Sequence, residues 1–287
     1  MVIKKVNKLN KKQIKNVMEL ISQCRAEEPT TITPTLTNEG NFDPDLPCMF
    51  LCEENGYLIS FVSIFMPTPY YGEVVGFTFP AARQRGYFMK TWLEALNVLG
   101  PHIEDMEIMF LTDGKSPSAL KTLEALKMHR EYSEYVMAKD ITYDEKNLTL
   151  TVKSLDPNDP GDANAIFMLH TNIFADGKSE TLTFLESTKQ QFTQNFLAVR
   201  KSDDKPVGLF HIALDGDRVF LFGVGVLPHY QGRGYGKQIV QLAMNQCDET
   251  FKSMGVQVSS LNEEAMGLYK SCGFQEVSRL DYYYDEI

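Results

Sequence analysis

Hydrophobic and polar residues along this chain follow patterns that predict alternating strands and helices. Residues 218–226 are almost wholly apolar, interrupted by Gly223 and Gly225, and predict a buried strand. Helices are predicted where apolar residues recur at intervals of three and four: Ile239, Val240, Ala243 and Cys247 in one, and Ala265, Leu268, Tyr269 and Cys272 in another. A glycine inside a strand often marks a bulge or a close backbone approach, so we expect an irregular strand at 218–226.

A glycine-rich turn, Gln231-Gly232-Arg233-Gly234-Tyr235-Gly236, joins this strand to the next helix. Glycine adopts positive φ and allows a backbone to approach a bulky group. Because the turn opens a helix, its free N–H groups and the helix dipole favour an anion, which we expect to be a phosphate. On the glycines alone, a tight connection without a ligand is the alternative.

A second copy of the motif lies in the first half of the chain. Pro80 aligns with Pro228, and Arg85-Gly86-Tyr87 aligns with Arg233-Gly234-Tyr235, at a constant offset of 148. After each copy the pattern predicts a helix, a strand (106–112 and 255–261), a helix (116–127 and 262–273) and an aromatic-rich strand (131–140 and 278–287). Repetition at half the chain length indicates duplicated domains.

The order of elements predicts an α/β (α+β) fold in each half, a mixed sheet covered by helices. We place the boundary in the charged stretch near residue 145, which gives an N-terminal domain at 1–145 and a C-terminal domain at 146–287. A length of 287 residues suits two domains.

Composition and charge narrow the functional classes. The formal net charge of −10 argues against nucleic acid as a partner and favours cationic ligands. Five cysteines without a framework spacing indicate reduced thiols, and we expect Cys48 and Cys52, four apart in an apolar run, to pack in a core and not to bind metal. The pattern contains neither a signal-peptide core nor a transmembrane span, so we expect a cytoplasmic protein without membrane association.

These residues resemble the GNAT superfamily of N-acetyltransferases, in its tandem two-domain type with the layout of mycothiol synthases. The turn fits the family pattern (Gln/Arg)-x-x-Gly-x-(Gly/Ala) at every position. The segment 262–274 is similar to a second family motif at six positions: Asn262, Ala265, Leu268, Tyr269, Gly273 and Phe274. The order of elements extends the resemblance over nearly the whole chain, whereas the specific motifs cover only the C-terminal part.

The resemblance implies a site for acetyl-coenzyme A, used as co-substrate without a metal. The pyrophosphate would rest on the turn, and the pantetheine arm would pair with the interrupted strand and reach Asn262. The implied coenzyme-binding residues are Val224, Gly225, Val226, Gln231, Gly232, Arg233, Gly234, Tyr235, Gly236, Lys237 and Asn262.

Two of these roles compete with plainer ones. The resemblance implies that the Tyr269 hydroxyl is the general acid toward the departing thiolate. The helical spacing alone equally predicts a buried core tyrosine. Asn262 is also a suitable helix N-cap, which is compatible with a contact to the pantetheine arm.

The general base stays open. The strand at 218–226 lacks the carboxylate that many family members carry there. His211, His229 or a water held by one of them is the candidate, although a lone strand histidine is more often a packing residue.

The first copy of the motif is degraded. Phe88 stands where the second copy has Gly236, and Leu123 stands at the position of Tyr269. Arg83 and Arg85 offer charges for a phosphate, so binding without turnover is one possibility and a purely structural half is the other.

From the resemblance we expect an N-acetyltransferase that transfers an acetyl group to a primary amine of a small molecule or peptide by direct attack. The chain is expected to be a monomer whose two domains form an internal pseudo-dimer. The rival hypothesis is a non-catalytic acyl-coenzyme A binding or interaction protein built on decayed folds of this family.

Overall fold

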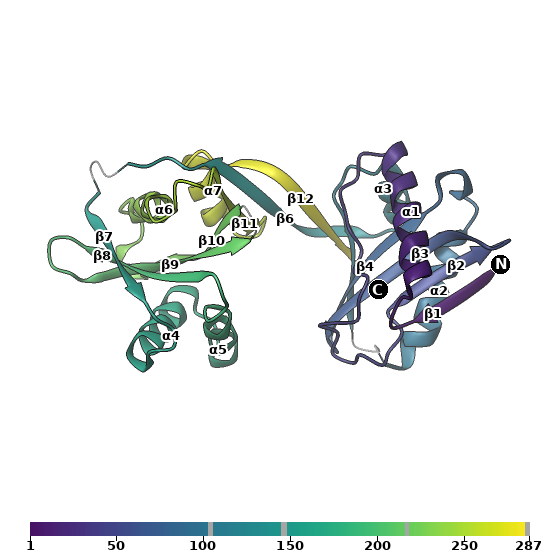
Figure 1. The fold of residues 1–287 in the computed structure, drawn as a ribbon, viewed down its shortest axis with the longest axis horizontal. Helices are drawn as coiled ribbons and strands as arrows, with labels where there is room; N and C mark the ends of the chain where they lie inside the picture. Colours follow the sequence, from purple (N-terminus) through teal and green to yellow (C-terminus); the bar gives the residue numbers. More distant parts are fainter. Residues whose placement is uncertain (103–105, 145–147, 216–217, 285–287) are drawn as a thin grey trace. The chain divides into compact units, whose positions relative to one another are not determined.

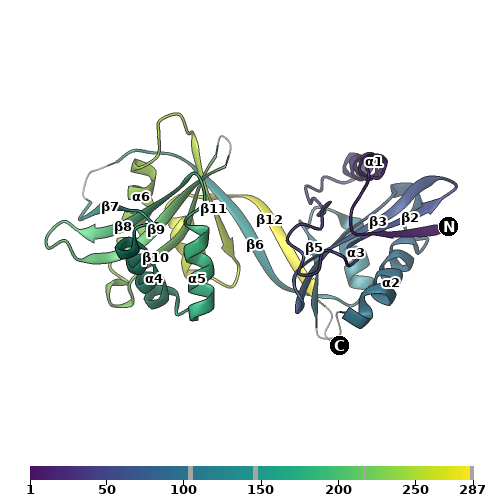
Figure 2. The same ribbon diagram turned by 60° about the horizontal axis from the view of Figure 1, so that its bottom comes forward.

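The computed structural model describes residues 1–102, 106–144, 148–215 and 218–284. By its internal contacts the chain groups into two units, Met1–Glu134 with the segment from Arg279 onward, and Tyr135–Ser278. The boundary predicted near residue 145 falls outside the described residues and stays a prediction. Figures 1 and 2 show the elements of each unit.

The first unit contains a mixed sheet in the order β1-β2-β3-β4-β5-β12. Its elements are β1 (Val2–Val6), α1 (Lys11–Glu27), β2 (Met49–Glu54), β3 (Tyr57–Thr68), β4 (Tyr71–Thr78), α2 (Tyr87–Leu99), β5 (Glu107–Thr112), α3 (Pro117–Ala125), the start of β6 (His129–Asp140) and the end of β12 (Gln275–Tyr284). Strand β12 runs antiparallel to β5, with Tyr282 opposite Leu111.

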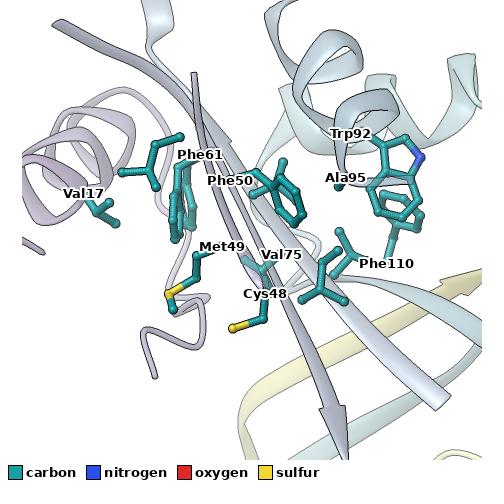
Figure 3. Packing of buried hydrophobic residues seen from close by; sticks show 14 of the residues in the cluster. Val17, Cys48, Met49, Phe50, Phe61, Val75, Trp92, Ala95 and Phe110 are labelled. Atoms are coloured by element: carbon teal, nitrogen blue, oxygen red, sulfur yellow. The ribbon is translucent and has the colours of Figure 1, made fainter. Parts of the chain in front are cut away.

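The core of the first unit lies on both faces of this sheet. Figure 3 shows Val17 of α1 on one side and Trp92 of α2 on the other. Phe61 and Phe50 fill the two faces between these helices, and both are fully buried. The Trp92 ring meets Phe110 edge to face at 4.9 Å between centroids. This dense aromatic packing fixes α2, the helix that follows the first copy of the glycine motif.

The second unit repeats the arrangement. Its elements are the end of β6, β7 (Leu150–Leu155), α4 (Pro160–Phe174), α5 (Lys178–Ser187), β8 (Thr193–Arg200), β9 (Pro206–Asp215), β10 (Arg218–Val226), α6 (Tyr235–Asn245), β11 (Ser253–Ser259), α7 (Glu263–Ser271) and the start of β12. The sheet order is β6-β11-β10-β9-β8-β7. Helices α4 and α5 cover one face and α6 covers the other (Figure 1).

The predicted mixed sheets covered by helices are confirmed. The apolar run at 218–226 is strand β10, and Ile239, Val240 and Ala243 form the buried side of α6. The predicted helix at 262–273 is found as α7. The aromatic-rich strand predicted at 278–287 is part of β12, and its last three residues lie outside the described part of the chain.

Candidate functional site in the second unit

The glycine turn has the conformation of an anion-binding loop. Gly232 and Gly234 take φ values of 72° and 78°, in the left-handed region that favours glycine. No side chain caps α6, whose N-cap is Gly234. The N–H groups at the start of α6 therefore lack intrahelical acceptors. A Cβ at Gly232 or Gly234 would meet no atom within 4 Å, so the space above the turn is open. An open, uncapped helix start suits a phosphate.

Cationic side chains gather beside the turn. The guanidinium groups of Arg200 and Arg233 lie 5.2 Å and 5.7 Å from the centre of the Tyr230 ring. Arg200 lies at the end of β8, pairs with Asp203 and interacts with Tyr235 of the turn. Arg200 is not among the residues predicted from the sequence, because the folded sheet, and not proximity in sequence, brings it next to the motif. Because Arg200 is already paired with Asp203, Arg233 is the charge at this edge that can complement an anionic ligand.

Two residues of the motif have structural contacts of their own. The Gln231 side chain donates a hydrogen bond from Nε2 to the Val226 carbonyl at 3.1 Å, which ties the turn to β10. A Cβ at Gly236 would lie 3.3 Å from the Leu268 side chain. Gly236 thus allows α6 to approach α7, the helix that carries Tyr269. The Lys237 and Tyr235 roles in coenzyme binding stay predictions.

Strand β10 is irregular where the pattern predicts it. Its register with β9 shifts between Phe222 and Gly225, and Gly223 takes a positive φ of 56°. Its parallel ladder with β11 contains Val219 and Phe220 only. Among the described residues, the part of β10 with Val224 and Val226 therefore has no ladder partner on the β11 side. An extended amide chain could pair there, because the backbone groups of a splayed strand need partners.

Helices α4 and α5 cover the bulge of β10. A Cβ at Gly225 would lie 2.4 Å from Cγ2 of Ile173 in α4. A Cβ at Gly223 would lie 2.8 Å from Cζ of Phe184 in α5 and 2.7 Å from Cδ2 of His211 in β9. Only glycines allow the backbone to come so close to these side chains. The bulge is thus enclosed on this face by apolar and aromatic groups.

Tyr269 is buried on α7, with 6% of its surface exposed. Burial, with a smaller effect of Cys272, raises the pKa of its phenol to about 12. The hydroxyl is therefore protonated at neutral pH, as a general acid must be. The ring also packs in the hydrophobic core and lies 5.6 Å from Phe274. Both predicted roles of Tyr269 are compatible with this position.

Asn262 caps α7. Its Oδ1 accepts a hydrogen bond from the Ala265 N–H at 2.9 Å. Together with Ser259 and Leu261 it lines an open depression of about 660 Å³ at the end of β11. The contact from Asn262 to a pantetheine arm stays a prediction that this cap allows.

The two candidate bases occupy different environments. His229 is exposed in the short helical turn Pro228–Tyr230 and lies against Tyr230, with 4.1 Å between ring centres. His211 is fully buried on β9 beside the bulge of β10. Burial, and secondarily His170, lowers the pKa of His211 to about 3. His211 is therefore neutral over the physiological range.

The turn of the first copy keeps its backbone conformation. Gln84 and Gly86 take φ values of 59° and 78°, at the positions of Gly232 and Gly234. A Cβ at Gly86 would likewise meet no atom within 4 Å. The degraded sequence has thus preserved the turn, with Gln84 accepting a conformation that costs a non-glycine residue about 1–2 kcal/mol.

The groove beside that turn is filled. The Phe88 side chain lies against β4, where a Cβ at Gly76 would come within 2.5 Å of its ring. It also meets Phe110 edge to face. Leu123, at the position of Tyr269, is a buried core residue. The first unit therefore has an open turn, but Phe88 fills the region beside β4 and a leucine stands at the position of Tyr269.

Arg83, at the start of the turn of the first copy, forms an ion pair. Its Nε donates to the Thr78 carbonyl, and its Nη1 lies 3.1 Å from Oε2 of Glu28. Glu28 also accepts hydrogen bonds from Ser116 and Ser118 at the start of α3. Burial opposes the ionisation of Glu28, but these hydrogen bonds outweigh it and lower its pKa. The Arg83 charge is thus already paired within the protein.

Comparison with known proteins identifies the class of this site. Residues 165–274 match the family model described as the acetyltransferase (GNAT) family. This segment includes β10, the glycine turn and α7. This part of the second unit is therefore similar to the GNAT family of acetyltransferases, and the similarity indicates acyltransferase activity. No curated protein gives a significant sequence match.

Solved structures extend the fold to the whole chain. A GCN5-related N-acetyltransferase from Sphaerobacter thermophilus is 15% identical with a TM-score of 0.67, over 99% of this chain and 95% of that one. A tandem GNAT protein from the clavulanic acid biosynthesis pathway, solved without AcCoA, is 11% identical with a TM-score of 0.64, over 99% of this chain and 98% of that one. A GNAT-family acetyltransferase from Colwellia psychrerythraea is 11% identical with a TM-score of 0.60, over 99% of this chain and 100% of that one. The tandem GNAT fold, predicted from the repeat together with the resemblance of the motifs, is confirmed.

Two further features concern the described residues only. No helix there is long and apolar enough to cross a membrane. All five cysteines are free thiols, and Cys48 and Cys52 are buried in the first unit.

Proposed function

We propose that the second unit transfers an acetyl group from acetyl-coenzyme A to a primary amine of a small molecule or peptide. The observation that carries the proposal is the adjacency of two features on one strand: the broken ladder of β10 and the open, uncapped glycine turn that follows it. Backbone groups without ladder partners suit an amide arm, and the turn suits the phosphates at the end of that arm. A coenzyme with both parts fits this arrangement.

In this proposal each group of the chain has a defined task. Acetyl-coenzyme A supplies the activated thioester. The turn around Gly234 holds phosphate through N–H groups, with Arg233 and Arg200 at its edge. The backbone of β10 around Val224 orients the arm and donates an N–H to the thioester carbonyl. The buried Tyr269 Oη donates its proton to the sulfur as the C–S bond breaks.

The attack is direct, without an acyl-cysteine. Cys247 and Cys272 are the cysteines of the second unit, and burial raises the pKa of both thiols. A thiol of raised pKa is a poor nucleophile at neutral pH. The amine therefore attacks the thioester itself.

The first unit is proposed to be structural. Phe88 fills the space beside β4, and the Arg83–Glu28 pair occupies the charge that a phosphate would need. Activity would then depend on one site per chain.

Thiol release tests the function. Purified protein is mixed with acetyl-coenzyme A and a panel of amines: polyamines, arylamines, amino acids, aminoglycosides and peptides with a free N-terminus. Amine-dependent release of coenzyme thiol, with the acetylated amine detected by mass spectrometry, supports the proposal. If calorimetry shows that acetyl-coenzyme A binds, but no amine of the panel causes release of the coenzyme thiol, the non-catalytic alternative is favoured.

A further inference from the structure

His211 is held in a single orientation by a buried hydrogen-bond chain. Its Nδ1 lies 2.7 Å from Oδ1 of Asn195 on β8. The Asn195 amide is itself oriented, because Nδ2 donates to the carbonyl of Thr188 at the end of α5 at 3.2 Å. An amide oxygen can only accept, so Nδ1 of the imidazole carries the proton. In the neutral ring, Nε2 is therefore a lone-pair acceptor.

That acceptor has no partner. Nε2 of His211 is one of the few buried side-chain polar atoms among the described residues that make no hydrogen bond. Buried polar groups are nearly always paired, and an exception calls for a bound group or a chemical role. A buried acceptor without a donor is unfavourable, so the site has a reason to hold a donor.

The unpaired nitrogen lies at the bulge of β10. Phe222 is opposite His211 in the β9–β10 ladder, and a Cβ at Gly223 would lie 2.7 Å from Cδ2 of the His211 ring. Cδ2 is bonded to Nε2 in imidazole. The acceptor is thus next to the part of the strand where the proposed function places the thioester.

Aromatic rings pack against the His211 ring. Phe184 and Phe222 have their centres 5.1 Å and 5.2 Å from that of His211. On its other side, Phe184 stacks on His170 at 3.9 Å. Burial lowers the pKa of His170 as well, in spite of Asp176 at 3.6 Å. Neutral rings give little compensation for a buried ammonium ion, so this environment favours an uncharged donor.

We infer that Nε2 of His211 accepts a hydrogen bond from the acceptor amine. This hydrogen bond orients the lone pair of the amine nitrogen toward the thioester carbon. This inference rests on the proposed function and names the group that receives the acceptor. The Phe184 ring packs edge to face on the His211 ring, so we expect its side chain to turn aside when the amine enters. The chemistry favours an amine that is largely uncharged at neutral pH and carries an aromatic or apolar body, such as an arylamine.

The proton balance is complete with two residues of this chain. The C–N bond forms, the C–S bond breaks, and the amine proton that is bonded to Nε2 moves to His211 once the new bond has made that nitrogen acidic. Tyr269 Oη gives its proton to the sulfur. Solvent returns a proton to Tyr269 and removes one from His211, so the net products are an amide and a thiol.

The test replaces His211 by Phe, which keeps an aromatic ring and removes the acceptor. Wild-type enzyme, His211→Phe and the control His170→Phe are compared with the best amine of the panel. His170 is a suitable control because it is a second buried histidine against the same Phe184 ring. We expect His211→Phe to lose about 100-fold or more in kcat/KM for the amine, the usual size of a positioned proton acceptor. Coenzyme affinity by calorimetry should stay within threefold, and His170→Phe should keep kcat/KM within threefold.

A folded His211→Phe variant with unchanged kcat/KM overturns the inference and leaves the acetyltransferase proposal standing. An equal loss in His170→Phe also overturns it, since that result indicates packing alone. If His211→Phe does not fold, ¹⁵N-histidine NMR of the wild type decides. Addition of the amine to the coenzyme complex should move the Nε2 resonance of His211, and an unmoved resonance contradicts the inference. If the wild type acetylates no amine, the proposed function fails and this inference fails with it.

Discussion

Gly223 gives the sharpest prediction about the bulge of β10. Gly223→Ala adds a Cβ to a residue at φ 56°, which costs about 1–2 kcal/mol in left-handed strain. The same Cβ would lie 2.7 Å from Cδ2 of His211 and 2.8 Å from Cζ of Phe184, distances at which atoms must shift. Overpacking of this kind costs about 1–3 kcal/mol. We therefore expect Gly223→Ala to lower the free energy of unfolding by about 2–5 kcal/mol.

Gly232→Ala separates strain from steric overlap. Gly232 also has positive φ, 72°, but its Cβ would meet no atom within 4 Å. We expect this control to lower the free energy of unfolding by about 1–2 kcal/mol, from left-handed strain alone. Urea denaturation followed by far-ultraviolet circular dichroism measures both variants, and a slope of about 1–3 kcal/mol per molar converts the midpoints into free energies. Equal losses of unfolding free energy in the two variants would contradict this prediction. They would show that the His211 and Phe184 side chains can shift away from the added Cβ without an energetic penalty.

Three further predictions concern titration and catalysis. Tyr269→Phe should lower kcat by about tenfold to a thousandfold with unchanged coenzyme affinity, whereas a tyrosine that only packs would give wild-type turnover. Burial raises the pKa of Tyr269 from 10.0 to about 12, so its contribution to stability is present below pH 10 and is lost as pH rises toward 12. Between these pH values, the free energy of unfolding of Tyr269→Phe should therefore fall less than that of the wild type in an alkaline denaturation series. The pKa of His211 falls from 6.5 to about 3, so the folded protein binds fewer protons than the unfolded chain between these values. Its stability contribution is therefore present above pH 6.5 and lost as pH falls toward 3, and His211→Phe should flatten that part of an acid denaturation series.

The repeat and the motifs predicted the fold well, because each rests on local rules. The glycine spacing of Gly232 and Gly234 requires a turn with positive φ, and the apolar spacing of Ile239 and Val240 requires a helix with one buried side. Both features are decided by neighbours in sequence.

Features that depend on distant neighbours were not predictable. An alternating strand pattern assigns the two faces of β12 but not its partner, so the pairing of Tyr282 with Leu111 in the first unit has no sequence signal. Arg200 reaches the turn only through sheet pairing. The Asn195–His211 hydrogen bond has the same origin, since the two residues are opposite each other in the β8–β9 ladder.

The degraded first copy shows a subtler limit. Phe88 stands in place of a glycine, but the turn keeps its conformation and the side chain packs against Gly76 and Phe110. Side-chain direction decides which space a substitution fills, and the spacing of residues does not give that direction. What Phe88 fills is the region beside β4, which in the second unit is the proposed place of the coenzyme arm.

We propose that one glycine turn, that of the second unit, binds the coenzyme for acetyl transfer. Gly86 and Gly234 provide a matched pair, because both have φ 78° and both would place a Cβ in open space. Gly86→Val and Gly234→Val should thus have similar effects on stability, checked by thermal melts. Calorimetric titration of acetyl-coenzyme A into each folded variant is the decisive measurement. We predict that Gly86→Val binds with wild-type affinity and that Gly234→Val loses affinity by about 100-fold or more. Retained binding in Gly234→Val, or its loss in Gly86→Val alone, would contradict the assignment of the site.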